Sequence, residues 1–197
     1  NRNIVSWGAM ISGYVQHGQP AYALHLFMRM QDEDIKTDVV MLASLLKACG
    51  DIKALQEGRL IHDQVLRSNL QLDIIIGNSL ITMYAKCGML VEALEVFDKL
   101  AEQTTVSWTT VIAGYIKLGF HEKALRCLEQ MQLQGILIDD VTFLCGLRAC
   151  ANTNAFYDGL AIHAQIVEEG FSWALCHFLH MYARCGYLLK HWMCFVN

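Results

Sequence analysis

The sequence predicts an all-α protein, a right-handed superhelical solenoid of stacked helix-turn-helix repeats. One observation is a duplication. Val5-Ser6-Trp7 returns as Val106-Ser107-Trp108, 101 residues later, and matches at this spacing continue as far as Ile61-His62 and Ile162-His163. The other is a shorter recurrence of amphipathic segments that each end at a glycine. Short units repeated in tandem stack on their neighbours and form a long binding surface.

The first helix of each predicted repeat ends in a recurring pattern. It holds an aromatic residue, three variable residues and a glycine, and it occurs in the segments 13–18, 83–88, 114–119 and 181–186. Glycine suits the left-handed conformation with which many helices end. We therefore expect each first helix to stop at this glycine.

The second helix is expected to begin shortly after the glycine, where Pro20 suits a first helical turn. The apolar residues that follow at helical spacing are Ala23, Leu24, Phe27 and Met30. They recur as Ala93, Leu94, Phe97 and Leu100, and as Ala124, Leu125, Leu128 and Met131. Each repeat is thus predicted to be a helical hairpin whose apolar side chains fill the space between neighbouring hairpins.

The hairpins are predicted to form a single array over residues 1–197. Its repeats cover residues 4–38, 39–73, 74–104, 105–139, 140–171 and 172–197. The first three are 35, 35 and 31 residues long and together make the 101-residue period. The last repeat loses the pattern, so Trp192, Met193 and Phe195 are expected at an uncapped apolar end. The chain begins without an initiator methionine, and we expect it to start within a longer protein.

The composition is compatible with a helical array but does not point to a partner. Hydrophobic residues make up 54% of the chain, which is enough for a continuous core. The net charge of −4 differs from the basic excess that is usual in nucleic-acid-binding proteins, although a local basic stripe is compatible with it. No apolar run is long enough to cross a bilayer, and no signal or transit segment is visible.

The eight cysteines form no Cys-x-x-Cys pair. Cys49 and Cys150 occupy one repeat position, and Cys87 and Cys185 another, which favours buried packing residues in a reducing compartment. The residue types of Cys176, His177, His180 and Cys185 could bind a metal, but Cys185 is equivalent to Cys87, which has no such neighbours. The sequence therefore predicts neither a metal nor a cofactor.

The segment from Ile4 to Tyr14 resembles the opening of a pentatricopeptide repeat. The alternation of 35, 35 and 31 residues resembles the plant subclass built from P, L and S motifs. On this resemblance, residues 4–38 and 105–139 are P motifs, 39–73 and the shortened 140–171 are L motifs, and 74–104 and the degenerate 172–197 are S motifs.

The resemblance implies sequence-specific binding of single-stranded RNA, about one base per repeat, each base being read by two or three side chains. It implies a mitochondrial or chloroplast location, a role in RNA editing or processing, and editing-factor proteins as further partners. Editing members carry a deaminase-like domain that needs His-x-Glu and Cys-x-x-Cys, and this chain has neither. An enzyme, a small-molecule substrate and a membrane are not expected.

By resemblance, the fifth and last residues of each motif select the base. These pairs are Gly8 with Asp38, Ala43 with Asp73, Asn78 with Thr104, and Thr109 with Asp139. Only Thr109 with Asp139 matches a family pair, the one for guanine. Gly8 and Thr104 depart from the usual residues, and Ala43 with Asp73 lies in an L motif, where the family's code is weak. We therefore expect weak recognition with guanine at the fourth repeat.

Two further columns of residues follow from the resemblance. Aliphatic side chains at the second position would wedge between bases: Val5, Val40, Ile75, Val106 and Val141. Basic side chains late in the first helix would contact phosphate: Lys86, Lys117 and Arg184. Gln16, Asp51 and Asn152 interrupt that stripe. Removing Lys86 or Lys117 is expected to weaken binding to all sequences and to flatten its salt dependence by about one charge.

Structural roles are open for most of these residues. The second-position aliphatic residues could pack in the hairpin core, which the sequence alone favours over wedging. The aspartates Asp38, Asp73 and Asp139 could cap the next helix. Repeat-to-repeat packing is favoured for Trp7 and Trp108, and a structural role for His62 and His163.

Two other functions remain as alternatives. One is a protein-binding scaffold resembling tetratricopeptide repeats, which keep a uniform period of about 34 residues, unlike this chain. The other is a non-functional truncated fragment.

Overall fold

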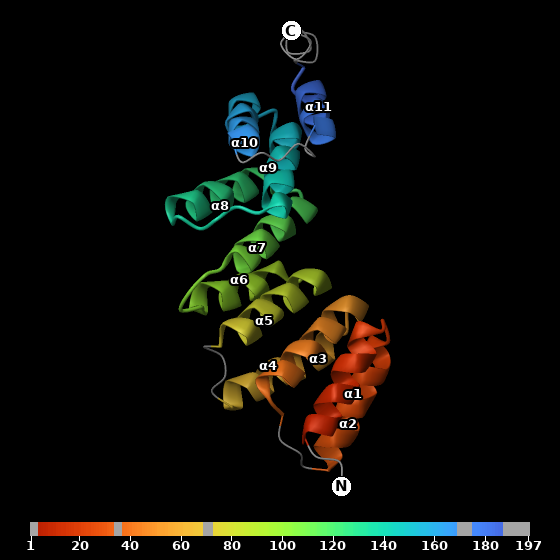
Figure 1. The fold of residues 1–197 in the computed structure, drawn as a ribbon. Helices are drawn as coiled ribbons and strands as arrows, with labels where there is room; N and C mark the ends of the chain where they lie inside the picture. The colour runs from red at the N-terminus through yellow and green to blue at the C-terminus, as the bar shows by residue number, and fades with distance from the viewer. Residues whose placement is uncertain (1–3, 34–36, 69–72, 169–174, 187–197) are drawn as a thin grey trace. The chain divides into compact units, whose positions relative to one another are not determined.

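The computed structural model describes residues 4–33, 37–68, 73–168 and 175–186, and within these ranges it is helical with short turns (Figure 1). The chain divides into two compact units, unit 1 over residues 1–103 and unit 2 over residues 104–197. No helix in the described ranges has the length and apolar character needed to cross a bilayer.

Unit 1 consists of three helical hairpins. Its helices are α1 (Ile4–Gln16), α2 (Pro20–Asp32), α3 (Val39–Ile52), α4 (Leu55–Arg67), α5 (Ile74–Cys87) and α6 (Leu90–Lys99). The first helices pack in series, α1 on α3 and α3 on α5. The second helices α2 and α4 each pack between the first helix of their own hairpin and that of the next.

Unit 2 repeats this arrangement. Its helices are α7 (Thr105–Lys117), α8 (His121–Leu133), α9 (Asp140–Thr153), α10 (Phe156–Glu168) and α11 (Leu175–Arg184). Here α7 packs on α9 and α9 on α11, while α8 and α10 each contact the first helices on both sides. The predicted all-α fold of stacked helix-turn-helix repeats is confirmed in both units, whereas a single array over the whole chain stays a prediction.

The helix boundaries lie where proline and glycine residues predicted them. Pro20 occupies the first turn of α2, and Gly18, Gly88, Gly119 and Gly186 all have positive φ angles between 69° and 83°. The second hairpin of each unit differs, because its first helix ends at a left-handed Lys53 or Asn154. These two residues are 101 positions apart. The duplication therefore preserved a left-handed backbone conformation that is unfavourable for residues other than glycine.

The apolar residues of the second helices pack as predicted, with Ala23, Phe27 and Met30 buried in α2. The two tryptophans are also buried, Trp7 completely and Trp108 to all but 4% of its surface, which confirms the packing role. The predicted exposed end at Trp192, Met193 and Phe195 lies outside the described residues.

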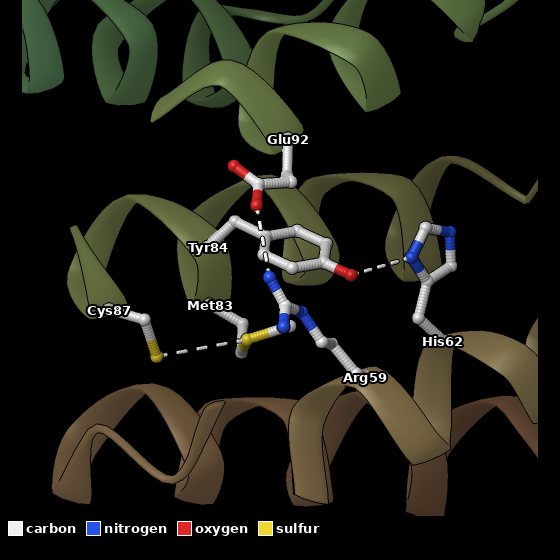
Figure 2. A network of polar contacts seen from close by, with 6 residues as sticks. All are labelled: Arg59, His62, Met83, Tyr84, Cys87 and Glu92. Carbon is white, nitrogen blue, oxygen red and sulfur yellow. Dashed lines mark hydrogen bonds and ion pairs between the residues drawn. The ribbon is translucent and has the colours of Figure 1, made fainter. Parts of the chain in front are cut away.

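A small polar network connects the second and third hairpins of unit 1 (Figure 2). His62 on α4 and the hydroxyl of Tyr84 on α5 share a hydrogen bond of 2.8 Å, and Arg59 on α4 donates to Glu92 on α6 at 3.2 Å. Burial raises the pKa of Tyr84, so its hydroxyl keeps its proton at neutral pH. Below this network Gly58 gives Met83 room, because a Cβ at that position would lie 2.6 Å from the Met83 sulfur.

Unit 2 contains the counterpart of this contact. His163 on α10 bonds to the Tyr182 hydroxyl on α11, and a Cβ on Gly159 would lie 2.8 Å from the Met181 sulfur. The favoured structural role of both histidines is thus confirmed. Each histidine links the second helix of one hairpin to the first helix of the next.

The cysteines match their predicted packing role only in part. Cys49 and Cys150 are fully buried, and burial raises the pKa of each thiol to about 12. Cys87 and Cys185 are only partly buried, so full burial is wrong for that position. Among the described residues no group of three potential ligands could hold a metal ion, and the side chains of Cys176 and His177 lie outside that description.

Candidate nucleic-acid interface

The aliphatic residues at the second position of each motif face solvent. Their exposed fractions lie between 53% and 70%, for Val5, Val40, Ile75, Val106 and Val141. The expectation that these side chains pack in the hairpin core is therefore wrong. Since residues three or four apart share a helix face, the fifth position lies next to the second on this exposed stripe.

The charges divide unequally between the first and second helices. The first helices carry five exposed basic side chains, Lys47, Lys86, Lys117, Arg148 and Arg184, against the two carboxylates Asp51 and Asp140. The second helices carry six basic and ten acidic side chains. The first helices themselves are thus net basic in both units. When the N-cap aspartates Asp38, Asp73 and Asp139 are added, only unit 2 stays net basic, so unit 2 suits a polyanion better than unit 1.

The three predicted phosphate-binding residues have different partners. Lys86 pairs with Asp51 at 2.6 Å, and both side chains are more than one-third exposed. Arg184 donates to the amide oxygen of Asn152 at 3.1 Å and keeps its full charge. Lys117 is exposed, and none of the described residues forms an ion pair or hydrogen bond with its ammonium group.

Sequence reasoning missed two basic residues of the same surface. Lys47 on α3 and Arg148 on α9 are both exposed and lie 101 residues apart. Arg148 follows Val141 by two helical turns and lines the same hollow of about 370 Å³, together with Leu144 and His180. The conserved spacing of two basic residues was a signal that could have identified them.

The last residues of the motifs are helix N-caps. Asp38, Asp73 and Asp139 accept hydrogen bonds of 2.8 Å from the backbone at the start of α3, α5 and α9. Every hydrogen bond to these carboxylates from the described residues reaches Oδ1, so Oδ2 stays available to a ligand. The capping role is confirmed and is compatible with base contact. Thr104 caps α7 through a reciprocal capping box with Ser107.

One predicted base-selecting pair comes together within its unit. The Thr109 hydroxyl lies 3.4 Å from Asp139 Oδ1, a long separation for a hydrogen bond between oxygens. The buried Thr142 connects them more closely, because its hydroxyl donates to Asp139 Oδ1 at 2.6 Å and lies 2.5 Å from Thr109 Oγ1. Sequence reasoning missed Thr142, which has no counterpart of its kind at the equivalent position of unit 1.

The other predicted pairs offer less to a base. Gly8 has no side chain, and a Cβ there would meet Met41 at an ordinary 3.5 Å. Ala43, the predicted partner of Asp73, has only a methyl side chain, which cannot form a hydrogen bond with a base. Asn78 belongs to unit 1 and Thr104 to unit 2, so these two residues do not form a pair within one unit.

Comparison with known proteins identifies relatives of a single kind. The profile of the PPR repeat family matches residues 2–51 and 103–152, and that of the PPR repeat matches residues 78–103. A pentatricopeptide repeat-containing protein of Arabidopsis thaliana is 36% identical over 96% of this chain and 28% of its own length. A chloroplastic one is 31% identical over 94% of the chain and 30% of its length, and a mitochondrial one 36% identical over 87% and 22%. The chain thus spans less than a third of the length of these relatives.

Solved structures agree on the fold. The crystal structure of the pentatricopeptide repeat protein PPR10 from maize is 19% identical to this chain and superposes with a TM-score of 0.68, over 96% of this chain and 29% of PPR10. PPR10 in complex with an 18-nt psaJ RNA element gives a TM-score of 0.67 over 96% of this chain and 26% of that one.

Proposed function

This chain belongs to the pentatricopeptide repeat family, and we propose that it binds single-stranded RNA along its first helices, about one base per motif, with guanine preferred at the fourth motif. The observation that carries the proposal is the convergence of Thr109 and Asp139 beside the exposed Val106. A hydroxyl and a carboxylate next to an exposed aliphatic side chain can bond to one base edge while its face packs on the aliphatic group.

The charge distribution supports RNA on the first helices over RNA on the second. Phosphate contacts supply much of the affinity for nucleic acid, and they need basic side chains that are free to bind. Lys117, Arg148 and Arg184 meet this need in unit 2. The second helices of unit 2 instead line a groove in which the carboxylates Glu122, Glu129 and Asp158 outnumber the cation Arg126, so that the groove would on balance repel a phosphate chain.

We extend the proposal to the subclass and the biological setting. The 35, 35 and 31 spacing and the left-handed Lys53 and Asn154 of two equivalent motifs favour the P, L and S subclass. The chloroplastic and mitochondrial relatives favour an organellar RNA as the target, and the subclass favours a part in editing or processing with editing-factor proteins as partners. In this proposal the chain itself binds RNA and catalyses no reaction.

A selection from a random RNA pool tests base recognition. The unaltered chain should enrich sequences with guanine at one position, and the variant Thr109→Ala should lose that preference. Thr110→Ala is the matched control, because the Thr110 hydroxyl donates to its own helix at Val106 at 2.7 Å. The proposal is wrong if no guanine position is enriched, or if the preference is the same in Thr109→Ala.

The salt dependence of binding tests which face holds the RNA. Replacing Lys117 with alanine should lower affinity for all sequences and reduce the slope of log K against log salt by about 0.7, the value expected for one single-strand phosphate. Arg126→Ala on α8 removes a charge from the second helix of the same hairpin and should change the slope much less. Equal effects of the two variants would contradict the proposed face.

A further inference from the structure

Thr142 occupies an unusual place at the fourth motif. It belongs to the first turn of α9, it is completely buried, and its hydroxyl lies between the two predicted base-selecting side chains. The distances are 2.6 Å to Asp139 Oδ1 and 2.5 Å to Thr109 Oγ1. The Thr142 backbone N–H donates to the same carboxylate oxygen at 2.8 Å.

The two short contacts decide the directions of these hydrogen bonds, because the 3.4 Å from Thr109 Oγ1 to Asp139 Oδ1 is too long to compete with them for a proton. A carboxylate only accepts, so the single hydroxyl proton of Thr142 points to Asp139. The Thr142 oxygen must then accept, and the proton that it accepts is that of Thr109. Thr109 therefore directs its own proton inward, and its oxygen presents lone pairs toward the exposed stripe.

The half-buried pair consequently offers acceptors alone, the Thr109 oxygen and Asp139 Oδ2. On the Watson–Crick edges of the RNA bases, only guanine has a ring N–H directly beside an amino group. Uracil has one ring N–H between two carbonyl groups, and adenine and cytosine place an amino group beside a ring acceptor. Two converging acceptors thus match guanine and leave the ring acceptor of adenine or cytosine unsatisfied.

We propose that Thr142 is a specificity-determining positioning residue, which fixes Thr109 as a hydrogen-bond acceptor and so makes the fourth motif selective for guanine. The inference rests on the proposed RNA-binding function. It adds a third residue, inside the next motif, to the pair that selects the base.

Unit 1 separates this role from helix capping. The position equivalent to Thr142 is Met41, which is also completely buried. Its backbone N–H donates to Asp38 Oδ1 at 2.8 Å, the same length as at Thr142. The cap forms without a hydroxyl at this position, so the Thr142 hydroxyl is not needed to start the helix.

The test compares Thr142→Val, which keeps the branched shape but removes the hydroxyl, with Thr142→Ser, which retains it. The RNA is the sequence selected by the unaltered chain, with guanine or adenine at the position that depends on Thr109. The preference for guanine should fall about tenfold in Thr142→Val, in line with the loss of one specific base contact, and should survive in Thr142→Ser. Affinity for the adenine RNA should change less than twofold.

The outcomes distinguish this inference from the proposed function. A guanine preference that persists in full in Thr142→Val overturns the role of Thr142 alone. An unaltered chain without any guanine preference overturns the proposed function, and the role of Thr142 with it. Circular dichroism establishes that the variants are folded, and Thr142→Ala provides a second hydroxyl-free variant if Thr142→Val is not. A uniform loss of affinity for both RNAs would show a purely structural role and also contradict the inference.

Discussion

Unit 1 and unit 2 begin with equivalent hairpins but differ in the groups that they would present to RNA. Trp7 and Trp108 are both buried at equivalent positions, and His62 and His163 make equivalent contacts with a tyrosine. At the predicted reading position, however, unit 1 has Gly8 where unit 2 has Thr109, and behind it the buried Met41 stands where unit 2 has the buried Thr142. Buried contacts between hairpins were retained, whereas the residues that would read a base were not.

The basic residues near the end of the first helices differ between the two units in the same direction. In unit 1 the carboxylate of Asp51 neutralises Lys86, and in unit 2 the uncharged Asn152 bonds to Arg184. The change from a carboxylate to an amide leaves the hydrogen bond in place but restores a positive charge to the surface. We infer that unit 2 contributes most of the base selectivity and the larger share of phosphate contact.

The largest expected difference concerns the capping aspartates. Asp38→Ala and Asp139→Ala should each lower the free energy of unfolding by about 1 kcal/mol, the usual value of an N-cap. Only Asp139→Ala should also reduce the preference for guanine, by about tenfold. Urea unfolding and fluorescence anisotropy with labelled RNA measure the two effects. Equal losses of RNA selectivity would remove the distinction between the units.

Placing the two threonines of unit 2 at the equivalent positions of unit 1 should reduce the difference in guanine preference between the units. Gly8→Thr together with Met41→Thr gives unit 1 the groups of unit 2, and Gly8 has room for a side chain. We expect the double variant to gain a second guanine preference of about fivefold, smaller than that of unit 2 because a shorter side chain leaves space in the Met41 site. The control is Gly8→Thr alone, in which Met41 cannot orient the new hydroxyl. Selection from a random RNA pool reports both results.

The scaffold could be predicted from the sequence more completely than the candidate site, and the reason is physical. Apolar spacing, turn glycines and capping aspartates act within a few residues, so the sequence predicted the hairpins and the capping alternative for Asp38. The exposure of Val5 and its equivalents depends on which helices pack against which. The link from Thr109 to Thr142 crosses 33 residues and depends on α7 lying against α9. No local pattern announces a contact of this kind.

Exchanging the neighbours of Lys86 and Arg184 should change RNA affinity by a smaller factor, in opposite directions in the two units. Asp51→Asn should release Lys86 and raise affinity for all RNA sequences about twofold, whereas Asn152→Asp should lower it by a similar factor. An exposed ion pair contributes little to folding, so neither variant should change the melting temperature by more than about 2 °C. Anisotropy titrations at two salt concentrations measure the affinities. Changes of the same sign in both variants would contradict this interpretation.

The smallest expected effect is a pH dependence of unit 1. Burial lowers the pKa of His62 below its ordinary value, so between the two values the unfolded chain binds more protons than the folded one. Stability should therefore be fully present above about pH 6.5 and decline as the pH falls below it. His62→Gln should reduce the slope of melting temperature against pH between 7.5 and 5.5. An unchanged slope would show that His62 is not the group responsible.

The contact between histidine and tyrosine has one more consequence, for the spacing of the chain. It joins residues 22 positions apart in unit 1 and 19 positions apart in unit 2. The same two side chains meet although the segment between them lost three residues. The contact itself, rather than a fixed length of the segment between its two residues, is therefore what the two units share at this junction.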